Sequence, residues 1–184
     1  MKACHCIGEN AVEIIGLDDP GQVDLFIEQQ SSAGDGRGMW TQISVPEIFQ
    51  LPANKPAIAT IDKVFVAAEI ISQRIVNTPV GPAPGQQNRE GTRLTGRKLA
   101  VEGKLRQKVV YTADLPQQPV YFAHFETYFS AFIVLSPNDD YNEFWVEAAI
   151  EDVFAIPFNP RQIFKNITLF LQAKPLRPDN CLSS

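Results

Sequence analysis

The chain has 184 residues, 45% of them hydrophobic, and a formal net charge of −5 at pH 7. That length and composition fit one globular domain with a buried core, and the acidic charge removes the usual electrostatic basis for binding nucleic acid or an anionic membrane surface. No apolar run reaches the roughly 20 residues of a membrane helix, and the N-terminal sequence MKACHCIGEN lacks the apolar core of a secretion signal. We therefore expect synthesis in the cytoplasm without a signal peptide, and neither a nucleic acid nor a membrane partner.

The residue pattern predicts a mostly β protein, folded as a single sandwich- or barrel-like domain. An extended N-terminal arm (residues 1–10) precedes the β-rich domain (11–173), and a short C-terminal tail (174–184) follows it. Runs rich in Val, Ile, Phe, Tyr and Thr predict strands at residues 12–15, 23–28, 40–45, 58–75, 99–111, 120–135, 144–154 and 163–171. Residues 31–38 and 81–91 have the Gly- and Pro-rich composition of exposed loops. Residues 46–51 predict one short helical turn that Pro52 ends.

The clearest strand is 99–111, where Leu99, Val101, Leu105, Val109 and Tyr111 alternate with charged residues. This period of two predicts one face in the core and one in solvent.

Two predicted strands, 58–75 and 120–135, exceed ordinary strand lengths. We expect each of them to bend at a bulge or to pair with two different sheets. Strand 120–135 is also apolar on both faces: Phe122 and Tyr128 fall on one register, and Tyr121, Phe125 and Phe129 fall on the other. Two interpretations stay open, a central strand between two layers of one core and a contact between subunits.

Six segments in order resemble the SPOCS domain, a module of spore-coat and spore-envelope morphogenesis proteins in clostridia and related spore formers. They are VPEIFQLPANKPAIATID (45–62), EIISQRIVNTPVG (69–81), LTGRKLAVEGKLRQKVVYTAD (94–114), AHFETYFSAFIVL (123–135), VEAAIEDV (146–153) and IFKNITLFLQA (163–173). The resemblance covers roughly residues 40–173 and implies a β-rich, non-enzymatic module used to build the outer layers of the spore. Unlike the multidomain spore proteins, this sequence has no peptidoglycan-binding LysM domain behind its module, which favours a free-standing building block. Within these segments, Gly96 and Gly103 are expected to permit close backbone approach or a bulge.

All three cysteines lie near the chain ends, as Cys4, Cys6 and Cys181. An odd number of thiols outside the folded body cannot be fully paired within one subunit, which favours disulfides between chains. Such bonds need an oxidising setting after release from the cytoplasm. Free thiols and a metal site built with His5 are the alternatives; the spacing does not match a self-contained zinc site, and we predict no metal and no cofactor.

The remaining candidates for chemistry have structural explanations. His124 is expected to be a structural histidine, because the sequence marks no nucleophile for a catalytic triad. Glu151 and Asp152 are expected to face opposite sides of a strand, which prevents joint action on one substrate. The sequon Asn166-Ile-Thr168 is attributed to chance, since it lies within a strand of a chain without a secretion signal.

We therefore expect a structural protein rather than an enzyme, one that assembles with copies of itself into a spore-surface layer or appendage. Subunits would join by addition of an arm or strand to a sheet edge, with interchain disulfides through the three cysteines. The alternative is an adaptor that docks another spore-envelope protein without polymerising. The expected final location is the spore surface or another extracellular structure.

Overall fold

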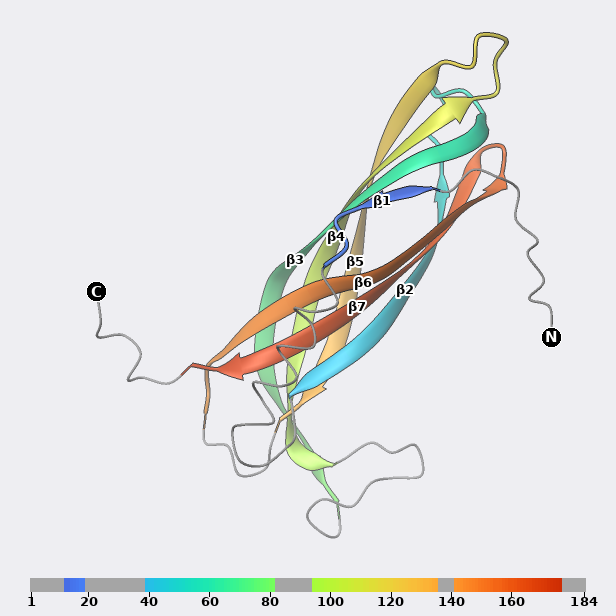
Figure 1. Cartoon of the computed structure of the whole chain (residues 1–184). Coiled ribbons are helices and arrows are strands. Elements are labelled where there is room, and N and C mark those ends of the chain that lie inside the picture. The colour runs from blue at the N-terminus through green and yellow to red at the C-terminus, as the bar shows by residue number, and fades with distance from the viewer. Residues whose placement is uncertain (1–11, 19–38, 82–93, 136–140, 177–184) are drawn as a thin grey trace, which may run out of the picture.

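The computed structural model describes residues 12–18, 39–81, 94–135 and 141–176 (Figure 1). Within these ranges the chain forms strands and no helix, and so contains no helix long and apolar enough to cross a membrane. The strands are β1 (Glu13–Ile15), β2 (Trp40–Gln50), β3 (Ile58–Val80), β4 (Thr95–Ala113), β5 (Val120–Val134), β6 (Phe144–Asn159) and β7 (Gln162–Pro175). The expected arm, the predicted strand 23–28, the loop 31–38 and nearly all of the loop 81–91 lie outside the described residues.

Two sheets pack face to face, which confirms the predicted mostly β, sandwich-like fold. One sheet has the order β1-β3-β4-β5 and the other the order β2-β7-β6, and all neighbours are antiparallel except β1 and β3. The core lies between them. Its fully buried members include Leu99, Leu105 and Tyr111 from β4, Ile133 from β5, and Ile163, Ile167, Leu169 and Leu171 from β7. The alternation read in residues 99–111 is confirmed, because every second residue of β4 points inward.

The predicted helical turn at residues 46–51 is wrong. Register partners continue from Pro46, opposite Asn166, to Gln50, opposite Gln162, so this segment extends strand β2. β2 is an edge strand whose one partner among the described residues is β7. A proline lacks the N–H that a central strand needs, but an edge strand has a side where no ladder hydrogen bond is required. The proline therefore marks the sheet edge rather than a break in the strand.

The two long strands behave differently. β3 shifts register against β4 at four places, which confirms the expected bulges, and Gly96, in the strand opposite the last shift, has a φ of 87°. β5 keeps one continuous register with β4 from Thr112–Val120 to Lys98–Val134. The expectation that β5 bends at a bulge or joins two sheets is therefore wrong. Its interpretation as a central strand between two layers of one core is also wrong, since Phe122 and Tyr128 on its second face are exposed. Among the described residues β5 is the last strand of its sheet.

The segment from β1 to Asp18 links the two sheets on one side of the sandwich. β1 runs parallel to β3 opposite Lys63–Phe65. Gly16, with a φ of 107°, then passes so close to the Val66 carbonyl that any Cβ would overlap it. Beyond it, the Asp18 amide donates to the Ile150 carbonyl of β6 at 3.0 Å, and the Ile150 amide donates to Asp18 Oδ2 at 2.5 Å. On this side of the sandwich, the β1–Asp18 segment therefore connects β3 of one sheet to β6 of the other.

Candidate functional site

The sequence-predicted site residues Cys4, Cys6 and Cys181 lie outside the described residues, together with His5. Their pairing stays a prediction. Among the residues that the structure does describe, no group of three or more His, Cys, Asp or Glu side chains is placed to hold a metal ion.

The sequence predicts His124 to be a structural histidine. It lies on the outward face of β5, exposed to solvent, and its ring meets that of Phe122 edge-on at 5.5 Å between centroids. The reason is topological. The other face of β5 points into the core, and no described strand covers the face that carries His124.

The other candidates also find local partners. β6 shifts its register against β7 between Ile150 and Asp152. Ile150 and Val153 are both buried, so Glu151 and Asp152 lie together between two consecutive inward positions. The expectation that they face opposite sides of the strand is therefore wrong at this bulge. Glu151 accepts a hydrogen bond from Gln42. Asn166 lies in β7, between β2 and β6, and accepts a hydrogen bond from Ser44 Oγ at 2.6 Å.

The outward face of β5 carries a row of exposed apolar side chains. Val120, Phe122, Tyr128 and Phe132 are 65%, 48%, 70% and 54% exposed. On the same register His124 and Glu126 lie between Phe122 and Tyr128, and Ser130 lies between Tyr128 and Phe132. Exposed apolar side chains gathered on one face can mark an interaction surface. We call this row, formed by Val120, Phe122, Tyr128 and Phe132, the β5 face.

Basic side chains border the β5 face. Lys108 Nζ lies 5.0 Å from the centre of the Phe122 ring and 5.3 Å from that of Phe65, and Lys55 Nζ lies 4.9 Å from the Phe122 ring. These are cation–π distances. At the other end of the row, Lys98 Nζ lies 5.8 Å from the Phe132 ring. The rings of Phe122 and Phe132 therefore already lie against cations of the same subunit.

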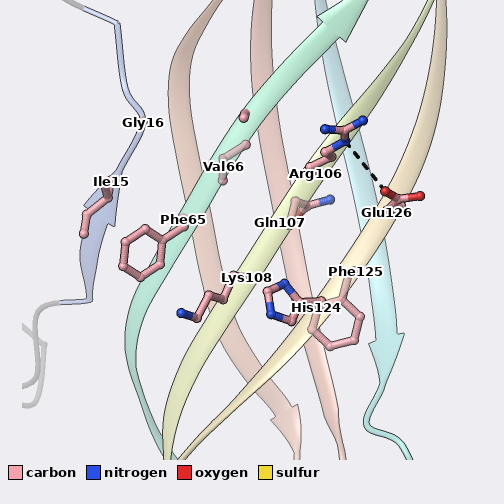
Figure 2. Close-up of a pocket in the computed structure, with 11 residues that line it drawn as sticks. Ile15, Gly16, Phe65, Val66, Arg106, Gln107, Lys108, His124, Phe125 and Glu126 are labelled. Atoms are coloured by element: carbon pink, nitrogen blue, oxygen red, sulfur yellow. Dashed lines mark ion pairs between the residues drawn. The ribbon is translucent and has the colours of Figure 1, made fainter.

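A shallow groove of about 390 Å³ crosses the same sheet beside this row, from Gly16 to His124 (Figure 2). Phe65, Lys108 and His124 lie in sequence across β3, β4 and β5. At one end, Arg106 pairs with Glu69 at 2.8 Å and with Glu126 at 3.8 Å. The groove thus offers apolar and cationic contacts with an ion-paired rim, a surface suited to contact rather than to enclosing a small molecule.

The edges of β2 and β5 lie on the side of the sandwich opposite the β1–Asp18 segment. The two strands contact each other across the sheets, where the Phe49 and Phe125 rings stack at 4.2 Å. Each pairs with one neighbour only among the described residues, β2 with β7 and β5 with β4. β5 is the longer, contains no proline and carries one carboxylate, Glu126. It therefore has few of the features that normally protect a sheet edge from pairing with another chain.

A second site lies inside the sandwich. Glu47 of β2 and Lys165 of β7 are directly paired residues that both point inward, with Lys165 Nζ 3.9 Å from Glu47 Oε2. From the facing sheet, Gln107 Nε2 donates to Glu47 Oε2 at 3.3 Å and the Thr127 hydroxyl donates to Glu47 Oε1. We call Glu47, Gln107, Thr127 and Lys165 the interior polar cluster.

Burial controls the electrostatics of this cluster. Loss of solvation lowers the pKa of Lys165 to about 7, and the nearby Glu47 carboxylate opposes this only in part. Loss of solvation likewise raises the pKa of Glu47, against the lowering effects of the Gln107 hydrogen bond and the Lys165 charge. The amine and the carboxyl group are therefore both shifted toward their neutral forms.

Sequence reasoning missed this cluster although a signal was present. In the predicted strand 163–171, Lys165 falls on the same register as Ile163, Ile167 and Leu169, so alternation alone places a lysine in the core. Its partner Glu47 lies in residues 46–51, for which the sequence predicts a helical turn. That prediction assigns Glu47 no inward position on a strand.

Comparison with protein-family models matches residues 83–156 to the family described as SipL, SPOCS domain. The matched range contains all of β4 and β5 and most of β6, and is shorter than the 40–173 over which the sequence segments show the resemblance. No curated protein and no solved structure matches the chain significantly. The family match indicates a spore-related role. The match over residues 83–156 supports the resemblance to the SPOCS domain that the sequence segments indicated.

Proposed function

We propose that this protein is a non-enzymatic structural subunit of the spore surface that assembles with copies of itself. One copy adds a strand, or its N-terminal arm at residues 1–10, to the edge of the next copy. Cys4, Cys6 and Cys181 then cross-link neighbouring subunits by interchain disulfides. The observation that carries the proposal is the edge of β5, with which no further described strand pairs, together with the exposed apolar β5 face.

The two sides of the sandwich differ in a way that favours this edge. On one side β3 pairs with β1, and Ile150 of β6 pairs with Asp18, so part of each edge is already occupied by the chain. On the other side β5 presents fifteen residues of strand that pair with β4 alone among the described residues. An added strand would gain main-chain hydrogen bonds there, and its side chains would lie beside the β5 face.

A second copy is the favoured occupant because the cysteines and the edge belong to the same chain. Addition of a segment from one subunit to an edge of the next is a head-to-tail contact, and it produces a filament when its rotation does not close a ring. Terminal thiols can reach a neighbour without disturbing the folded body. A spore-surface location also supplies the oxidising setting that interchain disulfides require.

Electron microscopy with reducing and non-reducing gels tests the assembly, and one matched set of variants tests the edge. Tyr128→Glu with Phe132→Glu places carboxylates on the β5 face, where Lys104 and Lys98 lie beside them within the subunit. Trp145→Glu is the control, an equally exposed aromatic residue of the other sheet paired with Lys174. We expect filaments or sheets from the parent protein and the control, and dispersed particles from the double variant.

The adaptor alternative makes a different prediction. It requires discrete small particles from the parent protein as well, with binding to another spore-envelope protein that the double variant loses. Ordered assemblies that form equally well from the double variant would leave the β5 edge without a role and would contradict the proposal.

A further inference from the structure

The interior polar cluster plays no part in the assembly just proposed, and its geometry is unusual. Lys165 is fully buried, and its Nζ has no hydrogen-bond partner in the part of the chain that the structure describes. The Phe49 ring centre lies 3.9 Å from Nζ and the Phe125 ring centre 5.6 Å, so aromatic rings form much of its surroundings. A buried ammonium normally has both an ion partner and satisfied hydrogen bonds. Here the amine faces a carboxyl group and two rings.

The carboxyl group of Glu47 is held in place from the opposite sheet. Thr127 donates to Oε1 and Gln107 donates to Oε2, so both carboxyl oxygens have a fixed donor while the amine approaches within 3.9 Å of Oε2. Glu47 and Lys165 are also register partners on adjacent strands, which fixes their backbones relative to each other. An amine and a carboxyl group held in this way have a very high effective concentration.

We propose that Lys165 and Glu47 condense into an intramolecular isopeptide bond between Lys165 Nζ and Glu47 Cδ. The inference is independent of the assembly proposal, since it concerns two residues inside one subunit. The interior polar cluster would then be a site of self-modification, and the product would be a covalent link between β2 and β7.

The condensation needs no co-reactant. One proton passes from the ammonium group to Glu47 Oε2, which leaves a neutral amine beside a neutral acid. The lone pair of Nζ attacks Cδ, the Nζ–Cδ bond forms, and the negative charge that develops on Oε1 is stabilised by the Thr127 hydroxyl. The Cδ–Oε2 bond then breaks as Oε2 takes a second proton from nitrogen and departs as water. The amide nitrogen keeps one hydrogen.

Burial favours this reaction for two reasons. A desolvated lysine is a nucleophile because its neutral form is populated near neutral pH. In water, condensation would have to compete with the strong hydration of the two ions. In the interior the ions have already lost that hydration, so replacing them by one neutral amide removes the cost of the buried charges.

The bond would secure an edge strand of the fold. β2 pairs only with β7 among the described residues, and a link at position 47 fastens it near its C-terminal end. The closed loop would run from residue 47 to residue 165 and include β3, β4, β5 and β6. Unfolding would then leave a constrained chain, as a disulfide across a long loop does.

Intact mass spectrometry of the full chain, unfolded and fully reduced, tests the proposal directly. We expect a mass lower than the sequence mass by one water molecule, and after proteolysis a branched peptide that joins the segments around residues 47 and 165. Reduction removes any mass change from disulfides, so the result does not depend on the proposed cross-linking of subunits. A mass equal to the sequence mass would overturn the proposal. A loss of one ammonia would mean that a side-chain amide such as that of Gln107 had reacted, and it would overturn the assignment to Glu47.

Two variants separate the chemistry from folding. Lys165→Met removes the amine but keeps an unbranched apolar side chain, and we expect it to fold and to show the full sequence mass. Thr127→Val keeps the shape of the side chain and removes the donor to Oε1, so we expect a mixture of linked and unlinked chains. Complete linkage in freshly prepared Thr127→Val protein would show that the hydroxyl has no role in the step.

Discussion

The ring of Phe129 lies directly over the backbone of Gly103, its register partner on the neighbouring strand β4. Both residues point into the core, and Phe129 is buried. A Cβ at position 103 would overlap three carbon atoms of the ring. The glycine therefore provides the space that the aromatic ring fills, which is a known way of stabilising glycine within a sheet.

Gly103→Ala should consequently destabilise the fold, because the ring of Phe129 is surrounded by other core residues and cannot move freely. We expect a loss of about 1–3 kcal/mol in the free energy of unfolding, the usual cost of overpacking. Urea denaturation monitored by tryptophan fluorescence measures it. The double variant Gly103→Ala with Phe129→Leu should recover part of the loss relative to the sum of the single changes. Strictly additive effects would mean that the two residues do not interact.

Arg161 connects the turn between β6 and β7 to the segment between β2 and β3. Its Nη1 donates to the Lys55 carbonyl at 2.9 Å, and its Nη2 donates to the carbonyls of Pro52 at 2.8 Å and Leu51 at 3.4 Å. Lysine has one nitrogen and cannot reproduce this forked arrangement. Arg161→Lys should therefore lower the free energy of unfolding by about 1–3 kcal/mol.

The matched control is Arg74→Lys. Arg74 is solvent-exposed and pairs with Glu102 at 3.4 Å, and an exposed pair of this kind contributes at most about 1 kcal/mol. Thermal unfolding of both variants, with the parent protein alongside, provides the comparison. Equal shifts in the two variants would indicate that the three carbonyl contacts of Arg161 contribute no more than a surface ion pair.

The sequence predicted the inward register of β4 because a regular alternation there was uninterrupted from Leu99 to Tyr111. It could not predict which strands form the edges, since alternation describes the two faces of a strand and says nothing about its neighbours. That is why the sequence left two interpretations open for β5 and why His124 proved exposed. The incorrect helical turn at Pro46 has a related cause. A proline is readily accommodated in an edge strand, and only the sheet topology shows that β2 is one.

Lys165 is the opposite case, a residue whose burial could have been predicted. It lies on an inward register whose other members are Ile163, Ile167 and Leu169. The role proposed for it depends on Glu47, Gln107 and Thr127, which come from three other strands. Local patterns do not bring such residues together, because their contacts follow from long-range strand order.

Tyr111 predicts a specific response to alkaline pH. Its side chain is fully buried and its hydroxyl donates to the Pro56 carbonyl at 3.2 Å. Burial raises the pKa of Tyr111 above its usual value of 10.0; Arg161 opposes the shift and Tyr121 adds to it. Because the unfolded chain then releases this proton at a lower pH than the folded chain, the contribution of Tyr111 to stability is present below pH 10 and is lost as pH rises through the folded pKa.

Spectrophotometric titration of phenolate absorbance tests this prediction. The parent protein should show one tyrosine component that ionises late, or only on alkaline unfolding, and Tyr111→Phe should lack it. Tyr128→Phe removes an exposed tyrosine and should leave the late component in place. Loss of the late component in Tyr128→Phe rather than in Tyr111→Phe would contradict the assignment.

The cysteines give a prediction that separates covalent cross-linking from strand addition. If the disulfides join subunits, the parent protein runs as a ladder on a non-reducing gel, and the ladder collapses on reduction. A variant with Cys4→Ser, Cys6→Ser and Cys181→Ser should run as a single monomer band under both conditions. Since main-chain pairing at the β5 edge does not require sulfur, electron microscopy should still show this variant assembled at ordinary temperature.

Heat and detergent then distinguish the two kinds of contact. Non-covalent strand addition dissociates when subunits unfold, whereas a disulfide keeps unfolded chains joined. We expect parent assemblies to survive heating in detergent until a reductant is added, and assemblies of the triple variant to dissociate on heating alone. Retaining only Cys181 should limit covalent products to dimers, because one thiol per chain forms one bond. Ladders longer than a dimer from that variant would show that the bands arise from something other than disulfides.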